Sequence, residues 1–363
     1  MTASKVLGYI TSENKTNNTK VLYLPCNKSQ FDMALILAEE SSFGGYIFAA
    51  SEFEIAARDY ASLKKDSRVS FFLNLNSVAS FLPSIDKIVV FVGSVTPFLS
   101  NDINKILSVC LQVKKEIYEV PHGLFQSGYN LCDTSNFIHT SSNVEGFGGM
   151  LPSITTNKLF WYGENGFGYP RYFDGNKIEN RVLPVFTLIT SNTNWYLYSM
   201  SDKRAFFKEI YSYAENNPST MFIWCPHPAE FVPDTFSSVA MEYRPKNIFI
   251  YGLDKDIYFN GIEGTDDLIP YCEYAISTVS TCLLDYEIYK KRVNIFSCEG
   301  VERLHADFIS KHCFTRSDQI SKDSCIIRTG LLKPFDSKKF DSLISQSSNQ
   351  RDLIDYFYLS SFV

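Results

Sequence analysis

His122 is the first residue of the 363-residue chain whose type and position could do chemistry. It follows the predicted strand at residues 116–120 almost directly and precedes Gly123, which lets a ligand or another backbone come close. An imidazole titrates near neutral pH, so His122 could take the proton of an acceptor hydroxyl group as a general base. A structural histidine bonded to a loop carbonyl would have the same sequence context.

His227 is the second such residue, and it lies between Pro226 and Pro228 just after the predicted strand at residues 221–224. The two prolines hold the backbone stiff and extended at this point. An N–H donor held there could neutralise a phosphate and ease the departure of a nucleotide. His-Pro is a common dipeptide, so a structural role for His227 also stays open. We predict His122 and His227 as catalytic residues and Pro228 as part of the phosphate site.

A run of hydroxyl residues follows another predicted strand, at residues 274–277, where we expect a helix to start near Thr278. Four hydroxyl groups beside the unpaired N–H groups of a helix N-terminus would suit a phosphate. Ordinary N-capping needs only one of them. Because capping accounts for only one hydroxyl group, we predict a phosphate or donor contact for this set of residues, which comprises Ser277, Thr278, Ser280 and Thr281.

Metal and cofactor motifs are weaker in this chain. Asp254-Lys255-Asp256 has the Asp-x-Asp form of some metal-dependent sugar-nucleotide sites, but Lys255 would oppose a cation, which favours a solvated loop. His305 and His312 lack the spacing of metal ligands, and the glycines at 146–149 follow no convincing strand. We expect no metal and no cofactor beyond a nucleotide-activated donor used as substrate.

The elements that must position these residues alternate between short apolar runs and helical stretches. This rhythm predicts βαβ units with a parallel sheet covered on both faces. Ligands of such sheets collect at the carboxyl ends of the strands, which is where both histidines fall. In the first half, strands are predicted at residues 20–25, 45–49, 68–74, 87–94 and 116–120, with helices at 31–40, 53–63 and 101–113.

A polar segment at residues 174–181 lacks periodicity and is the predicted linker. After it the rhythm restarts, with strands at 185–191, 221–224, 247–251, 274–277 and 293–296 and helices at 201–216, capped by Ser201 and Asp202, and 278–290. We expect an N-terminal acceptor-side domain at 1–173 and a nucleotide-donor domain at 182–335. For 336–363 we expect a loop over the Ser-rich stretch 337–348 and a C-terminal helix near 351–360 that returns to the first domain.

Composition excludes several classes of protein. Apolar residues make up 45% and charged residues 20% of the chain, as in a folded globular protein. A net charge of −6 without a basic block argues against nucleic acid as a partner. Nine cysteines in no close-spaced pairs predict reduced thiols. No signal peptide or membrane span of about 18 apolar residues is visible, so we expect a cytoplasmic protein, or one peripheral at the inner face of the cell membrane and its assembly machinery.

Four short motifs, in this order, resemble those of the CDP-glycerol glycerophosphotransferase (teichoic-acid polymerase-like) family. They are His122-Gly123, the Gly-Tyr-Pro-Arg segment at 168–171, His227-Pro228, and the segment 277–281 followed by Asp285-Tyr286. The resemblance covers about half of the chain, residues 119–296. It implies an α/β fold of the GT-B class, with two Rossmann-like parallel-sheet domains facing a central cleft. It also implies that the second domain holds most of the donor and the first holds the acceptor.

The sequence departs from that family where the donor would bind. Thr278 and Val279 replace the family's Asp and Tyr, and the segment 124–127 replaces its Thr-Pro-Leu-Lys. The His-Pro motif with a Ser/Thr pair is also similar to bacterial CMP-sugar transferases for sialic acid or Kdo. Both groups use cytidine nucleotides, so the resemblance implies a cytidine-type donor such as CDP-glycerol or a CMP-sugar and leaves the transferred group open.

The expected activity is therefore a metal-independent transferase, a glycosyltransferase or CDP-polyol phosphotransferase. It would extend or modify a bacterial surface polysaccharide, namely capsule, lipopolysaccharide (LPS or LOS) or a teichoic-acid-like polymer. A UDP-sugar epimerase would need carboxylates at the cleft, and apart from Glu119 none lies beside His122. A non-catalytic nucleotide- or sugar-binding partner of a polysaccharide assembly complex would tolerate loss of His122.

The acceptor, a glycan or a lipid-linked glycan, would bind in the first domain. Aromatic side chains mixed with amide and hydroxyl groups suit the two faces of a sugar, and residues 125–172 are rich in both. Packing in the core is the alternative for many of these rings. The predicted acceptor contacts are Gly123, Gln126, Trp161, Tyr162 and Arg171.

Overall fold

The computed structural model describes residues 19–49, 53–64, 67–91, 101–123, 157–173, 180–191, 198–227, 230, 240–302 and 311–346. The chain divides into two compact units. Unit 1 comprises Met1–Asp174 with Lys333–Tyr358, and unit 2 comprises Gly175–Leu332 with Leu359–Val363. Each unit contains one six-stranded sheet in which all paired strands are parallel.

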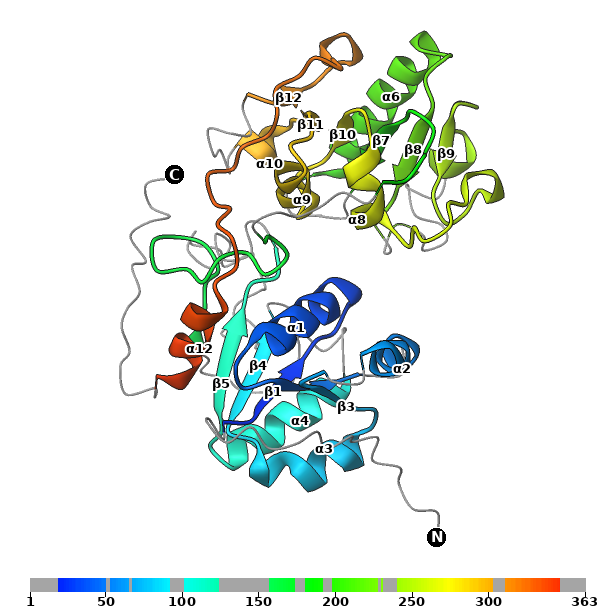
Figure 1. The fold of residues 1–363 in the computed structure, drawn as a ribbon. Coiled ribbons are helices and arrows are strands. Elements are labelled where there is room, and N and C mark those ends of the chain that lie inside the picture. Colours follow the sequence, from blue (N-terminus) through cyan, green and yellow to red (C-terminus); the bar gives the residue numbers. More distant parts are fainter. Residues whose placement is uncertain are drawn as a thin grey trace. The chain divides into compact units, whose positions relative to one another are not determined.

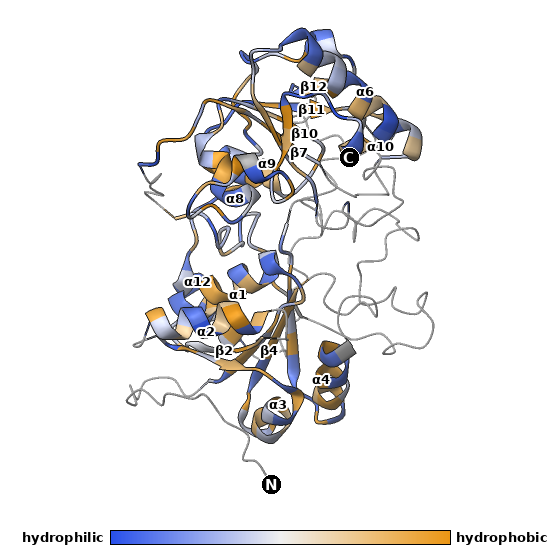
Figure 2. Ribbon diagram, turned by 90° about the vertical axis from the view of Figure 1, so that its right-hand side faces the viewer, coloured by the Kyte–Doolittle hydropathy of each residue, from blue (hydrophilic) through white to orange (hydrophobic). Residues whose placement is uncertain are grey.

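Unit 1 contains the sheet β3-β2-β1-β4-β5-β6 (Figure 1). Its strands are β1 (Val21–Leu24), β2 (Gly45–Phe48), β3 (Val69–Phe72), β4 (Lys87–Phe91), β5 (Glu116–Val120) and β6 (Asn157–Lys158). Its helices are α1 (Lys28–Glu40), α2 (Glu54–Leu63), α3 (Leu75–Phe81), α4 (Asn101–Gln112) and α12 (Ser337–Ser345). One face of the sheet bears α1 and α2 and the other bears α3 and α4 (Figure 2).

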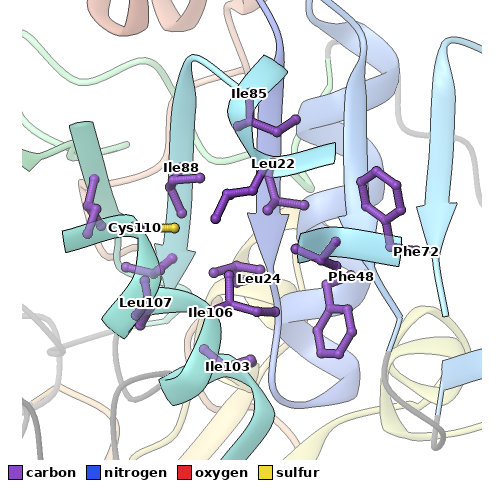
Figure 3. Packing of buried hydrophobic residues seen from close by; sticks show 14 of the residues in the cluster. Leu22, Leu24, Phe48, Phe72, Ile85, Ile88, Ile103, Ile106, Leu107 and Cys110 are labelled. Carbon is purple, nitrogen blue, oxygen red and sulfur yellow. The ribbon is translucent and has the colours of Figure 1, made fainter. Parts of the chain in front are cut away.

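The core of unit 1 explains why these short apolar runs become central strands. Leu22 and Leu24 of β1, with Ile88 and Val90 of β4, point alternate side chains to the same face. There they pack against the apolar stripe of α4, including Ile103, as Figure 3 shows. Burial of both faces selects continuous apolar strands, which is the pattern that the sequence predicts.

Unit 2 has the sheet β12-β11-β10-β7-β8-β9. Its strands are β7 (Thr187–Thr190), β8 (Phe222–Cys225), β9 (Ile248–Ile250), β10 (Ala275–Ser277), β11 (Val293–Phe296) and β12 (Cys313–Phe314). Its helices are α6 (Met200–Asn216), α8 (Thr265–Leu268), α9 (Cys282–Ile288) and α10 (Glu299–Glu302). In both sheets the chain leaves the first strand in one direction and later returns to its other side, which places a topological switch point between β1 and β4 and between β7 and β10.

The predicted fold class is confirmed: the chain is α/β with two Rossmann-like parallel-sheet units, the domain composition of the GT-B class. No described helix is long and apolar enough to cross a membrane. The predicted linker at 174–181 lies mostly outside the described residues, and the predicted helix near 351–360 lies entirely outside them.

Three local predictions were wrong. The helix α6 is capped by Ser199, which forms a capping box with Asp202, and Ser201 is already helical. The predicted loop at 337–348 contains α12, whose N-terminus is capped by the Asp336 side chain. Buried Phe340 anchors that helix by packing against Phe167, so the segment returns to unit 1. The third concerns the start of α9 and bears on the predicted phosphate site.

Candidate functional site at the carboxyl edge of the unit 2 sheet

The adjacent strands β10, β7 and β8 end side by side at one edge of the unit 2 sheet. At the switch point, Thr190 Oγ1 donates to Ser277 Oγ at 2.7 Å, and Ser277 Oγ donates to the Thr278 carbonyl at 2.7 Å. The Tyr286 hydroxyl lies 3.1 Å from Thr190 Oγ1 and completes this buried chain. Ser277 is fully buried and its hydroxyl is used within the protein, so its contribution is to join two strands.

The loop between β10 and α9 contains the other predicted hydroxyl residues. The helix α9 begins at Cys282 and not near Thr278, so Thr278 and Ser280 belong to a loop and not to a helical first turn. The loop is fixed because the Val279 N–H donates to the Tyr198 hydroxyl at 2.8 Å, which in turn donates to the Phe296 carbonyl at 3.0 Å. The expected placement of these residues at a helix N-terminus is therefore wrong.

Two hydroxyl groups in this loop are buried without a hydrogen-bond partner, Thr278 Oγ1 and Ser280 Oγ. Leaving one buried polar group unsatisfied costs about 1–3 kcal/mol. Such groups are uncommon in native proteins and call for an explanation, of which a ligand or an ordered water is one. Thr281 is half-buried and stands at the N-cap position of α9, with helical backbone angles and no side-chain capping hydrogen bond.

Glu230 organises the neighbouring end of β8. Its Oε2 accepts the Ser191 hydroxyl at 2.6 Å and the His227 backbone N–H at 2.8 Å. The Trp224 indole N–H donates to Ser191 Oγ at 2.7 Å, and the Glu230 N–H donates to the His227 carbonyl at 2.7 Å. These bonds fix the backbone of His227, which the sequence predicted to be held by its flanking prolines; Pro228 lies outside the described residues.

Lys203 of α6 gives this cluster a buried positive group. Its side chain is 6% exposed, and burial lowers its pKa while the charge of Glu230 opposes that shift. The imidazole of His227 is accessible at the surface, yet the protein packed around it desolvates it and lowers its pKa. Glu230 opposes this shift and Lys203 adds to it. At neutral pH His227 is therefore a neutral N–H donor beside a cationic neighbour.

His122 lies at the corresponding edge of unit 1, just beyond β5. Its ring is half-buried, and its Nδ1 lies 3.2 Å from Nε2 of Gln30, a fully buried side chain in the first turn of α1. Gln30 Oε1 accepts the Cys26 N–H at 2.8 Å, while Asn27 caps the helix. The turn after β1 and the end of β5 are thereby joined across β4.

The predicted acceptor residues in unit 1 differ in exposure. Trp161 is 1% exposed and packs edge-on against Tyr162 and at a tilt against Tyr169, with centroid distances of 5.0 and 4.9 Å. Its predicted contact with an acceptor conflicts with this burial, because its ring belongs to the core. Tyr162 and Arg171 are half-buried, and the backbone of Gly123 is buried. Gln126 lies outside the described residues.

The Gly-Tyr-Pro-Arg segment has a structural explanation. Gly168 adopts a φ of +81°, and a Cβ there would lie 2.0 Å from the Pro334 carbonyl oxygen, so only glycine fits. The next residue, Tyr169, donates its N–H to the Lys333 carbonyl at 3.0 Å. This motif therefore docks the returning chain onto unit 1.

Asp254 is also accounted for by structure. Both of its carboxylate oxygens accept from Arg244 Nη2 at 2.6 Å, and one also accepts the Ile250 N–H at 2.6 Å. The predicted solvated loop at Asp254-Lys255-Asp256 is therefore wrong for Asp254, whose half-buried carboxylate is bound within the protein. In the described part of the chain, no group of three His, Cys, Asp or Glu side chains is arranged to hold a metal ion.

No protein-family model matches the chain, and no curated protein matches it. Among solved structures it is similar to the UDP-GlcNAc 2-epimerase of Methanocaldococcus jannaschii in complex with UDP-GlcNAc and UDP (11% identity, TM-score 0.49, 90% of this chain and 98% of that one). Others are a UDP-glucosyltransferase from Polygonum tinctorium (10%, 0.41, 92% and 90%) and MurG of Acinetobacter baumannii (9%, 0.43, 91% and 100%). At these values the activity has to be inferred from the chain's own residues.

Proposed function

We propose that this protein is a transferase that binds a nucleotide-activated donor at the carboxyl edge of the unit 2 sheet. The observation that supports this most is the placement, at the ends of the adjacent strands β8 and β10 and the start of α6, of His227, cationic Lys203 and two buried, unpartnered hydroxyl groups, on Thr278 and Ser280. N–H donors, a cation and hydroxyl groups are the partners that phosphate oxygens accept from. The switch point of a doubly wound sheet is also where nucleotides bind in such folds.

The reaction would be transfer to a hydroxyl group of a glycan or lipid-linked glycan. The bond between the transferred group and the nucleotide phosphate breaks and its electron pair leaves with the phosphate, while a bond to the acceptor oxygen forms and the hydroxyl proton passes to solvent water. Donor groups at His227 would stabilise the charge that develops on the departing phosphate. His122 of unit 1 is the proposed catalytic residue on the acceptor side.

The motif resemblance supports a cytidine nucleotide as donor and a bacterial surface polysaccharide as product. The competing donor is a uridine nucleotide, since the similar epimerase structure from Methanocaldococcus jannaschii contains UDP. A ligand that binds only the native state raises thermal stability by mass action, so a thermal-shift panel of CMP, CDP, UDP and GDP ranks the candidates. Stabilisation by none of the four would refute the proposed site.

Thr278→Val tests whether the unpartnered hydroxyl serves a ligand. The isosteric change removes a desolvated group, so the unliganded protein should be as stable as the wild type or more stable. Nucleotide affinity should nevertheless fall by about tenfold, the loss of one hydrogen bond of ~1.4 kcal/mol. Thr220→Val, in the turn before β8 at the opposite edge of the sheet, is the matched control and should leave affinity unchanged. Equal affinities for the two variants would exclude Thr278 from the site.

A further inference from the structure

Gln30 forms a contact with His122 that the sequence does not predict, and the contact determines where the histidine carries its proton. The Gln30 side chain is 0% exposed, so water does not compete for its amide. One terminal atom of the amide lies 2.8 Å from the Cys26 backbone N, and the other lies 3.2 Å from His122 Nδ1.

The orientation of the amide follows from chemistry. A backbone N–H can only donate, so the atom facing Cys26 must be the amide oxygen, and a flipped amide would place two donors together. The atom facing His122 is then the NH2 group, which can only donate. His122 Nδ1 must therefore accept, and a neutral imidazole whose Nδ1 accepts has its proton on Nε2.

We propose that Gln30 is a positioning residue that holds His122 as the neutral Nε2–H tautomer, so that His122 offers an N–H donor to a hydroxyl oxygen of the acceptor. This role rests on the proposed transfer reaction and replaces the general-base role predicted from the sequence. A base acting through Nε2 needs its lone pair there, which this tautomer lacks. A second proton on Nδ1 would bring two donors face to face, so the contact also disfavours the imidazolium.

The decisive measurement is the tautomer itself, read from the ring nitrogen resonances of the full-length protein labelled with 15N-histidine. The spectrum of His122→Ala identifies the His122 signals among those of the five histidines. At pH 8 and without nucleotide, the wild-type ring should show a protonated Nε2 and an unprotonated Nδ1. A protonated Nδ1 in the wild type would overturn the proposal.

Gln30→Glu tests the cause. A carboxylate can accept from Cys26 and from His122 Nδ1–H together, so this variant should move the proton to Nδ1 or leave both nitrogens protonated. Gln112→Glu, at the exposed end of α4, adds the same charge and should leave the His122 signals unchanged. An unchanged tautomer in Gln30→Glu would also overturn the proposal. Since no ligand is added, these outcomes are independent of whether the nucleotide panel succeeds.

Discussion

Replacement of Glu230 should destabilise unit 2 by an amount that depends on the replacing residue. The carboxylate is 2% exposed, and a single oxygen, Oε2, accepts both the Ser191 hydroxyl and the His227 N–H. Glu230→Ala leaves both donors without this acceptor. Glu230→Gln can place its amide oxygen in the same position and keep both bonds without the charge.

The magnitudes follow from these two bonds. Hydrogen bonds to a charged group contribute ~1.5–3 kcal/mol each, so Glu230→Ala should lower the free energy of unfolding by about 3–6 kcal/mol. Neutral hydrogen bonds contribute ~0.5–1.5 kcal/mol each, so Glu230→Gln should lose about 2–3 kcal/mol. Both variants remove the negative charge of Glu230, which opposes the lowering of the Lys203 pKa by burial. The pKa of Lys203 should therefore fall further in both.

Urea unfolding followed by tryptophan emission and circular dichroism measures these free energies by linear extrapolation. Trp224 donates to Ser191, so its indole lies within the perturbed network. Glu215→Ala and Glu215→Gln, on the exposed face of α6, are the matched controls and should change stability by less than about 0.5 kcal/mol. If Glu230→Ala is no less stable than Glu230→Gln, the two bonds do not organise this edge of the sheet.

Four further predictions concern the two histidines, metal dependence, acid stability and the acceptor. His227→Ala should weaken nucleotide binding, whereas His122→Ala should leave it nearly intact and abolish turnover; equal affinity losses in a titration would contradict these roles. Transfer activity should survive EDTA, because N–H and hydroxyl donors can offset the phosphate charge, and rescue by magnesium after chelation would refute this. Although burial alone would raise the pKa of Glu39, hydrogen bonds from Tyr60 and Ser67 and the charge of Lys64 lower it overall. Its contribution to stability is therefore full above its ordinary pKa of 4.5 and lost as pH falls through the lower folded pKa, so Glu39→Gln should flatten acid unfolding curves below pH 4.5. Tyr162→Ala should raise the acceptor KM with little change in nucleotide affinity, and unchanged acceptor kinetics would place the acceptor elsewhere.

The strands were predictable because each is buried on both faces. Residues 87–91 and 116–120 form strands β4 and β5 as predicted, since a continuous apolar run is what a central parallel strand requires. The start of α9 was not predictable from its hydroxyl residues. Thr278 resembles a capping residue, but the loop that contains it is held by the Tyr198 hydroxyl, which comes from a distant part of the chain.

The helix α12, in contrast, has sequence signals for a helix, but its serine-rich composition led to the prediction of a loop. Serines suggested a loop at residues 337–348, yet Asp336 is a favourable cap and Phe340 and Ile344 are four residues apart. Both apolar side chains are fully buried against unit 1. The spacing of the apolar residues therefore predicts the secondary structure of this segment better than its serine content does.

Two of the residues that sequence reasoning missed, Gln30 and Lys203, share one feature, a polar side chain on the apolar stripe of a helix. In α1 the buried positions begin with Gln30 and continue with apolar residues, and in α6 they begin with Lys203 and continue in the same way. Each of these helices follows the first strand of its sheet, so its first turn lies beside the switch point and its buried face meets the carboxyl edge. A polar residue at that position cannot be satisfied by the core and must find its partner among the residues that end the strands. Gln30 contacts a histidine there, and Lys203 interacts with Glu230 and a second histidine. A polar residue that interrupts the apolar stripe in the first turn of such a helix is therefore a sequence signal for a functional site.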